Sequence, residues 1–370
     1  MQPHEIAERH RRRALVSLDL GRFASAEEEA RAALAADPRD DEALIILTRA
    51  RLGAGRLEAA VESAREAVAV APQRGYSHYL LGFALQCLGR YEESLGPLGE
   101  ALSLEPLLGR YHVRMALSLG EQGATSEAVA TVERALELSP RDGVVLEVAA
   151  RVLGQCRELD RAEALARQLV ALEPDSGASF GRLAWVLTER GRYAESIEAA
   201  RQAIELEPNN YAAWANLGFA ALELDRRDEA IVASREALRL RPGLVSATTN
   251  LVTALRATGQ LDEALRVVAY AHQRDPKSPG IARLYAEVSG EIDRRDTLRW
   301  SDRVVLTTLL LGLTVAVSMV WPWAGVAVGA VCLVLAVLLW RRVVPMRLPK
   351  GLGGEAEGEG EADRDPSPRE

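Results

Sequence analysis

The sequence is poor in aromatic side chains. Phenylalanine, tryptophan and tyrosine make up 5% of its 370 residues, although 48% of the residues are hydrophobic. The apolar content is therefore mostly alanine, leucine and valine, which is typical of helices packed closely through small side chains and not of a β-sandwich. Basic residues are outnumbered, and the net charge is −8 along the chain, so no basic surface for nucleic acid is expected.

Residues that commonly carry chemistry are also scarce. The three cysteines, Cys87, Cys156 and Cys332, are too few and too scattered for a disulfide framework or a zinc site. The five histidines stand at no metal-ligand spacing; they are His4, His10, His78, His112 and His272. No nucleophile elbow, phosphate loop, HExxH or dinucleotide fingerprint occurs, so we expect no enzyme, no cofactor and no small-molecule substrate. The N-terminus lacks the apolar core of a secretory signal peptide.

Proline is what the sequence repeats. Eight of its 16 prolines recur at one constant interval: Pro38, Pro72, Pro106, Pro140, Pro174, Pro208, Pro242 and Pro276. Eight units of this length follow one another without a gap over 7–278. A fixed period of about 34 residues predicts a stack of equivalent supersecondary units.

Two columns of the repeat hold small side chains. Twelve residues before each proline stand Ala26, Ala60, Ser94, Ala128, Ala162, Ser196, Ala230 and Ala264. Five residues before it stand Ala33, Ala67, Ala101, Ala135, Leu169, Ala203, Ala237 and Ala271. Small residues seven positions apart on one helix allow a neighbouring helix to approach closely. Between the two helices of each unit, glycine marks a turn with positive φ, except at Arg157 and Asp225.

The unit that contains Trp214, Leu217, Gly218, Ala230 and Pro242 closely resembles the tetratricopeptide consensus, and so does the unit from Ser77. The resemblance covers about 272 residues, in eight units in register. It implies an all-α fold, a right-handed α-solenoid of helix-turn-helix repeats over 7–278 after an N-terminal extension, 1–6. His78 and His112 share a column that normally holds a packing aromatic residue, so we expect them to pack.

In tetratricopeptide families the first helices of the repeats line a groove that holds an extended or helical peptide. The resemblance therefore places candidate peptide-binding residues in the lining columns: Tyr76, Tyr79, Phe83, Arg110, Arg114, Arg151, Arg182, Trp185, Asn216, Phe219, Asn250 and Arg256. Aromatic rings offer contact area at low entropic cost, and guanidinium groups bind carboxylates in a bidentate manner. The alternative explanation is equally weighted: asparagine is common in its column and the arginines are simply solvated. The carboxylate-clamp subfamily needs a set of residues that is incomplete here, where only Arg114 and Arg182 fit.

Two segments need separate expectations. Gly96-Pro97 lies inside the second helix of the third unit and predicts a kink or a delayed helix start. Residues 279–298 predict a closing helix and linker, because Ile281, Leu284, Tyr285 and Val288 are spaced to cover the last unit's apolar face.

The longest apolar run is unlike the rest of the chain. Residues 304–340 contain no charged side chain, and Trp321-Pro322-Trp323 divides them into two stretches, about 304–320 and 324–340. Each stretch is at the short end of the spanning range, and tryptophans bracket both, so we expect a transmembrane hairpin within 299–342. Residues 343–370 are rich in glycine and glutamate and predict a disordered acidic tail.

Basic residues flank the apolar run and are missing from its centre. Arg294, Arg295, Arg299 and Arg303 precede it, and Arg341, Arg342, Arg347 and Lys350 follow it. The positive-inside rule then predicts a cell-membrane protein with two spans, whose termini and repeats are cytoplasmic. The sequence thus favours a membrane-anchored scaffold that binds a protein or peptide partner. The alternative is a structural or assembly subunit of a membrane complex, in which the hairpin itself is a binding surface.

Overall fold

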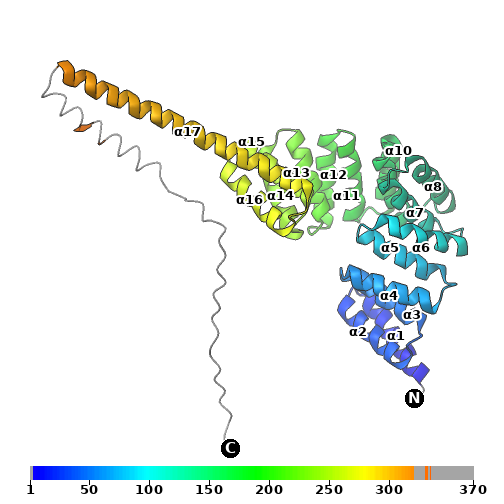
Figure 1. The fold of residues 1–370 in the computed structure, drawn as a ribbon. Coiled ribbons are helices and arrows are strands. Elements are labelled where there is room, and N and C mark those ends of the chain that lie inside the picture. Colours follow the sequence, from blue (N-terminus) through cyan, green and yellow to red (C-terminus); the bar gives the residue numbers. More distant parts are fainter. Residues whose placement is uncertain (1–2, 321–329, 332–333, 335–370) are drawn as a thin grey trace, which may run out of the picture. The chain divides into compact units, whose positions relative to one another are not determined.

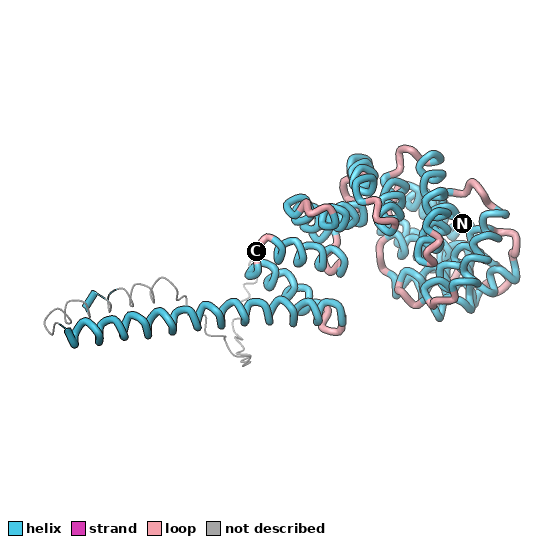
Figure 2. The backbone as a smooth tube through the Cα atoms, turned by 90° about the horizontal axis from the view of Figure 1, so that it is seen from above, coloured by secondary structure: helices cyan, strands magenta, loops and turns pink. Residues whose placement is uncertain are grey.

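The computed structural model describes residues 3–320, 330–331 and 334. The chain divides into two compact parts, Met1–Ser289 and Gly290–Glu370. Within the described residues the regular structure is entirely helical, and seventeen helices follow one another through short loops (Figures 1 and 2). The all-α solenoid expected from the sequence is confirmed.

Helices alternate as the first and second members of eight units. The first helices are α1 (Pro3–Asp19), α3 (Asp41–Gly53), α5 (Gly75–Cys87), α7 (Gly109–Glu121), α9 (Gly143–Gln155), α11 (Gly177–Glu189), α13 (Tyr211–Glu223) and α15 (Val245–Ala257). The second helices are α2 (Phe23–Ala36), α4 (Leu57–Val70), α6 (Tyr91–Leu104), α8 (Thr125–Leu138), α10 (Leu159–Leu172), α12 (Tyr193–Leu206), α14 (Arg227–Leu240) and α16 (Leu261–Arg274). From α2 onward, equivalent helices begin at the same position of each unit, so the sequence period is also the structural period.

The turn inside each unit needs a left-handed backbone conformation. Glycine supplies it in six units, with φ from 67° to 78°. Arg157 and Asp225 adopt the same conformation, with φ of 67° and 57°, although they carry side chains. A non-glycine residue is strained there by roughly 1–2 kcal/mol. The packing of the repeat therefore determines the left-handed conformation at this turn, even where the residue is not glycine.

The small-residue columns lie at the helix crossings. All eight members of the first column, from Ala26 to Ala264, are fully buried. The second column is also buried, including Leu169, which is 1% exposed. The expected close packing is confirmed.

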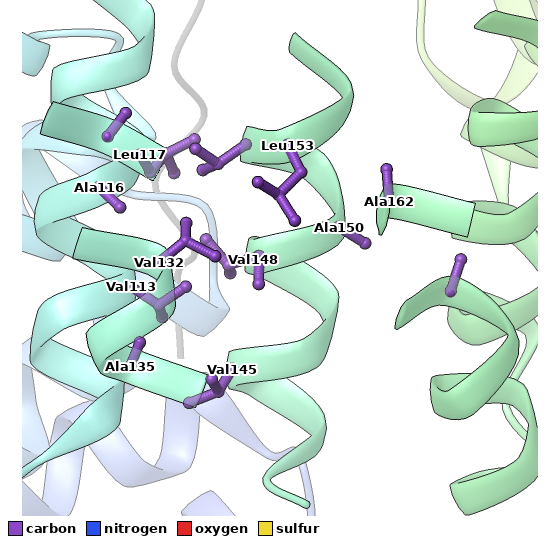
Figure 3. Packing of buried hydrophobic residues seen from close by; sticks show 14 of the residues in the cluster. Val113, Ala116, Leu117, Val132, Ala135, Val145, Val148, Ala150, Leu153 and Ala162 are labelled. Carbon is purple, nitrogen blue, oxygen red and sulfur yellow. The ribbon is translucent and has the colours of Figure 1, made fainter. Parts of the chain in front are cut away.

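Valine and leucine complete the core next to these small residues. Figure 3 shows Val113, Val132, Val145 and Leu153 converging from α7, α8 and α9, with Ala135 close beside them. Each of these side chains is fully buried. Core residues thus come from neighbouring units, so a single unit cannot bury its own apolar face.

Side-chain hydrogen bonds join successive units at one column. His78 Nε2 lies 2.9 Å from the carbonyl oxygen of Pro72, and His112 Nε2 lies 2.8 Å from that of Pro106. Trp214 Nε1 donates in the same way to Pro208, at 2.9 Å. Because the acceptor is a carbonyl oxygen, Nε2 of each histidine carries the proton. An imidazole therefore replaces an indole here as a structural donor.

The proline inside α6 does not delay the helix. α6 runs over Tyr91–Leu104 with Pro97 in its interior, and it begins at the same place in the repeat as the other second helices. Of the two expected alternatives, the delayed start is therefore wrong, and the kink stays a prediction. Leu98, fully buried, and Ala101 on the same helix bind it to the core, and this packing outweighs the missing backbone hydrogen bond.

The closing helix is longer than expected. α17 extends over Pro279–Val320 without a break, so no linker separates the segment up to residue 298 from the apolar residues after it. Its first turns cover the last unit as predicted, because Ile281, Leu284 and Val288 are buried. Tyr285 stacks on His272, with ring centroids 5.3 Å apart.

Among the residues that the structure describes, no helix combines the length and apolar character needed to span a bilayer. The expected turn at Trp321–Trp323, nearly all of the second span and the acidic tail lie outside the described residues.

Candidate peptide-binding surface

All twelve predicted residues lie on first helices, from α5 to α15. They do not form one site. The structure brings five of them together on α5 and α7: Tyr76, Tyr79, Phe83, Arg110 and Arg114. The other seven are distributed over α9, α11, α13 and α15, where most of their polar groups contact neighbouring helices.

Stacked rings form the centre of the first group. Tyr79 is buried, and its ring centroid lies 5.7 Å from that of Tyr76 and 6.4 Å from that of Phe83. Tyr111 of α7 also stacks on Tyr79, at 4.8 Å. Offset stacking at these distances adds roughly 0.5–1.5 kcal/mol per pair beyond the burial of area. The rings therefore hold one another in place.

A cavity opens beside this ring stack. It has a volume of about 340 Å³ and lies between α3 and α5. Its lining consists of Arg49, Leu52, Gly53, Tyr76, Tyr79, Leu80, Phe83 and Cys87. We call it the aromatic pocket. It combines apolar walls with one cationic group, which is the usual composition of a binding site.

Arg114 covers one face of Phe83. Its guanidinium carbon lies 4.2 Å from the centre of that ring, a cation–π contact. Its Nε is buried and has no hydrogen-bond partner in the described chain. Nor does any carboxylate of the described residues pair with Arg114 or with Arg49 of the pocket. These two cations are available to a ligand.

The other predicted arginines are already paired. Arg110 lies 2.7 Å from Asp142, Arg151 lies 2.6 Å from Glu121, and Arg256 lies 3.5 Å from Glu287. Arg182 bonds to Glu147 of α9 and lies over the Trp185 ring, 5.4 Å from its centre. These guanidinium groups tie each first helix to a neighbouring first helix or, for Arg256, to α17, and are not simply solvated.

The two asparagines also contact neighbouring helices. Asn216 Nδ2 donates to the carbonyl oxygen of Gly181, and Asn250 Nδ2 donates to that of Ala215, each at 3.3 Å. Asn250 is 5% exposed. Each amide thus uses one of its two N–H donors on the preceding first helix, and its second N–H and its carbonyl oxygen make no hydrogen bond within the described chain.

The last two aromatic residues have different environments. Trp185 packs against Gly154, where an added Cβ would come within 2.6 Å of the indole ring. Phe219 is 38% exposed and meets Tyr193 edge-on, with centroids 6.4 Å apart. Neither lies within a stack like that of the aromatic pocket.

Three titratable groups in or beside the aromatic pocket, those of Tyr76, Cys87 and Tyr111, have a raised pKa. Burial raises the pKa of the Tyr76 hydroxyl, and Arg49 opposes this only in part. Desolvation by the surrounding protein also raises the pKa of the Cys87 thiol, although the residue is solvent-accessible, and the charge of Arg114 opposes that rise. Burial, with a contribution from Glu105, raises the pKa of Tyr111. At neutral pH neither a thiolate nor a phenolate offsets the two arginines.

Three family models match the chain. A tetratricopeptide-repeat model matches residues 11–77, a TPR-repeat model matches 186–225, and a further tetratricopeptide-repeat model matches 211–243. The chain contains tetratricopeptide repeats. No curated protein matches it.

Solved tetratricopeptide-like structures share the fold. The Cut9–Hcn1 hetero-tetramer of the APC/C aligns with a TM-score of 0.58 at 17% identity over 74% of this chain, and yeast Tom70 with 0.55 at 16% over 74%. The chain spans 55% and 61% of their respective lengths. A tetratricopeptide repeat protein from Parabacteroides merdae aligns with 0.55 at 16% identity, over 68% of this chain and 99% of that one. Identities this low show the fold alone.

The sequence analysis missed Arg49, Leu52 and Tyr111. A signal for Arg49 was present, because it stands one repeat before Phe83 and therefore in the same column. Tyr111 had no such signal, since its column holds Ser77 in the preceding repeat. Its ring contributes to the stack only because α7 packs against α5.

Two buried ion clusters were also missed. Glu27 and Glu163 stand in one column, four units apart, and are 3% and 2% exposed. Arg31, Arg51 and Arg56 surround Glu27, with the closest pair at 2.8 Å. Arg167, Arg190 and Arg192 surround Glu163 in the same manner. Each buried carboxylate thus joins arginines of two adjacent repeats.

A second cavity lies where the last two repeats meet. It has a volume of about 330 Å³, and its walls include Leu238, Leu251, Glu263, Tyr270 and Arg274. Arg274 Nη1 donates to the Tyr270 hydroxyl at 3.2 Å and so closes one side. Glu263 places a carboxylate among the arginines of this cavity, and no ring stack adjoins it. Arg274 also lies over the Tyr270 ring, 5.8 Å from its centre. Because Glu263 places a carboxylate in the lining and Tyr270 already holds Arg274, we assign this cavity no ligand.

Proposed function

We propose that the protein is a membrane-anchored scaffold whose tetratricopeptide repeats bind a protein partner through the first helices. Repeats of this kind present extended binding surfaces, and the chain shares their fold. The observation that carries the proposal is the aromatic pocket, where stacked rings lie beside two arginines that no carboxylate of the described chain neutralises.

The anchor is proposed from the apolar run of the sequence. Residues 304–340 carry no charge, and eight basic residues flank them. On the described part of α17, Val305, Leu309, Val315 and Met319 are 51–83% exposed, which is costly in water and favourable in lipid. The charge distribution favours two spans, with the repeats and both termini on the cytoplasmic side of the cell membrane.

Cysteine labelling tests the anchor. In the full chain, Cys87, Cys156 and Cys332 are replaced by serine, and single cysteines are introduced as W323C, S301C and S367C. A maleimide that cannot cross membranes, added outside intact cells, is expected to label only W323C. Labelling of S367C but not S301C would show a single crossing, and recovery of all three variants unlabelled in the soluble fraction after cell lysis would exclude an anchor.

Partner capture tests the scaffold. The full chain is crosslinked with formaldehyde in intact membranes, purified and analysed by quantitative mass spectrometry, because its two lysines make amine-specific reagents unsuitable. Phe83→Glu places a charge in the aromatic pocket and is expected to remove the partner. Leu172→Glu, at a residue of α10 that is 44% exposed, is the control and should retain it.

The alternative is an assembly subunit that binds through the hairpin. In that case both substitutions would leave the captured proteins unchanged, and a chain whose apolar run is replaced by another transmembrane hairpin would lose them. The scaffold predicts that Phe83→Glu removes the partner, that Leu172→Glu retains it, and that the chain with the replaced hairpin retains it too.

A further inference from the structure

The chemistry of the aromatic pocket specifies a class of partner. We propose that it binds an acidic linear peptide in which a large apolar side chain stands next to aspartate or glutamate. The apolar side chain enters between Leu52, Tyr79 and Phe83, and the carboxylates bind Arg49 and Arg114. This inference rests on the proposed function and adds to it the nature of the ligand.

The local charge is the first argument. Four arginines, Arg49, Arg74, Arg110 and Arg114, surround the ring stack, on a chain whose net charge is −8. Arg74 is paired with Asp41, and Arg110 with Asp142. Glu105 accepts a hydrogen bond from the Tyr111 hydroxyl of the stack, so four guanidiniums stand against three carboxylates. The excess positive charge lies on the side of Arg49 and Arg114, and an acidic ligand complements it.

The state of Arg114 is the second argument. Its Nε is buried without a hydrogen-bond partner in the described chain, while its guanidinium group covers the Phe83 ring. A guanidinium placed in this way has already lost part of its hydration, and the ring holds its orientation. An incoming carboxylate would satisfy it with short charge-assisted hydrogen bonds.

The shape and composition of the pocket are the third argument. Leucine side chains and stacked rings form its walls, and its volume of about 340 Å³ is at the small end of ligand sites, suited to one side chain. An entirely polar acidic peptide would leave these walls exposed to water. An apolar residue beside the acid fills the pocket and brings the carboxylate to its rim.

Nucleic acid is the competing macromolecule, because bases also stack on aromatic rings and phosphates also bind arginine. The spacing of the rings disfavours it. Tyr76, Tyr79, Phe83 and Tyr111 stack on one another at 4.8–6.4 Å, so most ring faces are already occupied and few are free for bases. We therefore commit to the peptide and include an oligonucleotide in the test.

The test is a fluorescence-anisotropy titration of the full-length chain in a mild detergent. The probes are short labelled peptides with a phenylalanine flanked by aspartates, matched peptides in which asparagine replaces the aspartates or serine replaces the phenylalanine, and a labelled oligothymidylate. We expect the first peptide to bind at least about tenfold more tightly than the others, since each charge-assisted contact contributes a factor of that order.

Charge reversal sharpens the test. Arg114→Gln should weaken the acidic peptide about tenfold. The double variant Arg49→Glu, Arg114→Glu should instead prefer a peptide in which lysines flank the phenylalanine. Arg151→Gln, at a guanidinium already paired with Glu121, is the matched control and should change the affinity less than about twofold. Far-UV circular dichroism establishes that each variant is folded.

Three outcomes would overturn the inference: equal binding of all the peptides, tighter binding of the oligothymidylate, or an unchanged preference in the double variant. The scaffold proposal would survive any of these as long as Phe83→Glu still removes the crosslinked partner. If Phe83→Glu left the crosslinked partner unchanged while the peptide still bound, the scaffold proposal alone would be wrong.

Discussion

Two identical triplets, Gly82-Phe83-Ala84 and Gly218-Phe219-Ala220, stand at the same place in repeats that are four units apart. Phe83 contacts Tyr79 and the Arg114 guanidinium. Phe219 has neither neighbour, because the residues at the corresponding positions are Ala215 and Asn250, and Asn250 bonds to the backbone of α13. The same phenylalanine is part of a cationic aromatic pocket in one region, and in the other it is partly exposed and contacts only the edge of Tyr193 among the aromatic rings of the described residues.

The comparison shows that the position in the repeat determines where a side chain lies, but not whether that side chain is free to bind a ligand. Arg182 and Arg114 share a column, and the residue that faces Arg182 stands 35 positions earlier in the chain. For Arg182 that residue is Glu147, which pairs with it. For Arg114 the equivalent residue is Tyr79, which cannot. Whether an arginine of this column is free to bind a ligand therefore depends on the residues of two adjacent repeats.

The largest expected effect tests the framework that both regions share. Ala60→Arg in the second repeat and Ala230→Arg in the seventh each put a charged chain into a fully buried helix crossing. Each should lower the free energy of unfolding by roughly 4 kcal/mol, measured by urea unfolding followed by circular dichroism. Ala212→Arg, at an exposed residue of α13, is the control and should leave it unchanged. If only one of the two variants, Ala60→Arg or Ala230→Arg, left the unfolding curve unchanged, the two regions would not share the same helix packing.

The buried ion clusters rank next. Glu163→Ala leaves Arg167, Arg190 and Arg192 without their common carboxylate and should cost about 3 kcal/mol of stability. Glu27→Ala should cost a similar amount, since three arginines also surround Glu27. The control is Glu198→Ala, whose side chain is 72% exposed, with an expected change below about 0.5 kcal/mol. Urea unfolding of the three variants is the measurement, and equal effects at Glu163 and Glu198 would contradict the structural role of the cluster.

The paired and unpaired arginines should separate stability from binding. Arg182→Ala removes a link between α9 and α11 and should reduce stability by about 1 kcal/mol without affecting the peptide. Arg114→Ala should weaken peptide binding and change stability by less than about 0.5 kcal/mol. Urea unfolding and anisotropy titration of both variants check this prediction. It would be wrong if the two substitutions produced the same pair of changes.

Smaller effects are expected at the turns. Arg157→Gly should raise stability by about 0.5 kcal/mol, because glycine adopts positive φ without strain but gains freedom in the unfolded chain. Gly191→Ala should lower it by about 1 kcal/mol at the equivalent turn. Thermal unfolding of the two variants is the measurement. A loss of stability in Arg157→Gly would indicate that the arginine side chain matters more than its backbone.

The smallest effect concerns the thiol of the aromatic pocket. Because the pKa of Cys87 is raised, less thiolate is present at a given pH, and its reaction with a disulfide reagent should be slower than that of a cysteine in an unstructured peptide. The midpoint of the pH–rate profile should lie above the peptide's and move still higher in Arg114→Ala, which removes the opposing cation. Cys156 and Cys332 are replaced by serine for this measurement. An unmoved midpoint would mean that Arg114 does not act on the thiol.

Much of the fold could be predicted from the sequence because the repeat averages over local exceptions. Eight prolines in register locate the unit boundaries, and the alanine columns locate the helix crossings, even where Arg157 holds the place of glycine. The start of α6 could not be predicted from Pro97 alone, because the packing of Leu98 against neighbouring helices decides it. At Pro97, tertiary contacts outweigh the low helix propensity of proline.

The candidate site was only partly predictable for a related reason. The columns identified first-helix positions whose aromatic residues, Tyr76, Tyr79 and Phe83, stack together in the structure. They could not indicate that Arg110 pairs with Asp142, since such pairs join residues about one repeat apart and depend on how adjacent first helices pack. Comparing each column residue with the one that faces it from the preceding repeat would have separated Arg114 from Arg182.

One measurement tests the central claim most directly, that the repeats bind their partner through the aromatic pocket and not along the whole first-helix face. A photo-crosslinking amino acid replaces Phe83 in one full-length chain and Phe219 in another, and both are irradiated in intact cells. Because the two positions are equivalent in the repeat, only their surroundings differ. The account predicts an abundant covalent adduct with a partner protein from position 83 and little from position 219. Equal adducts from both positions, or a stronger adduct from position 219, would contradict it.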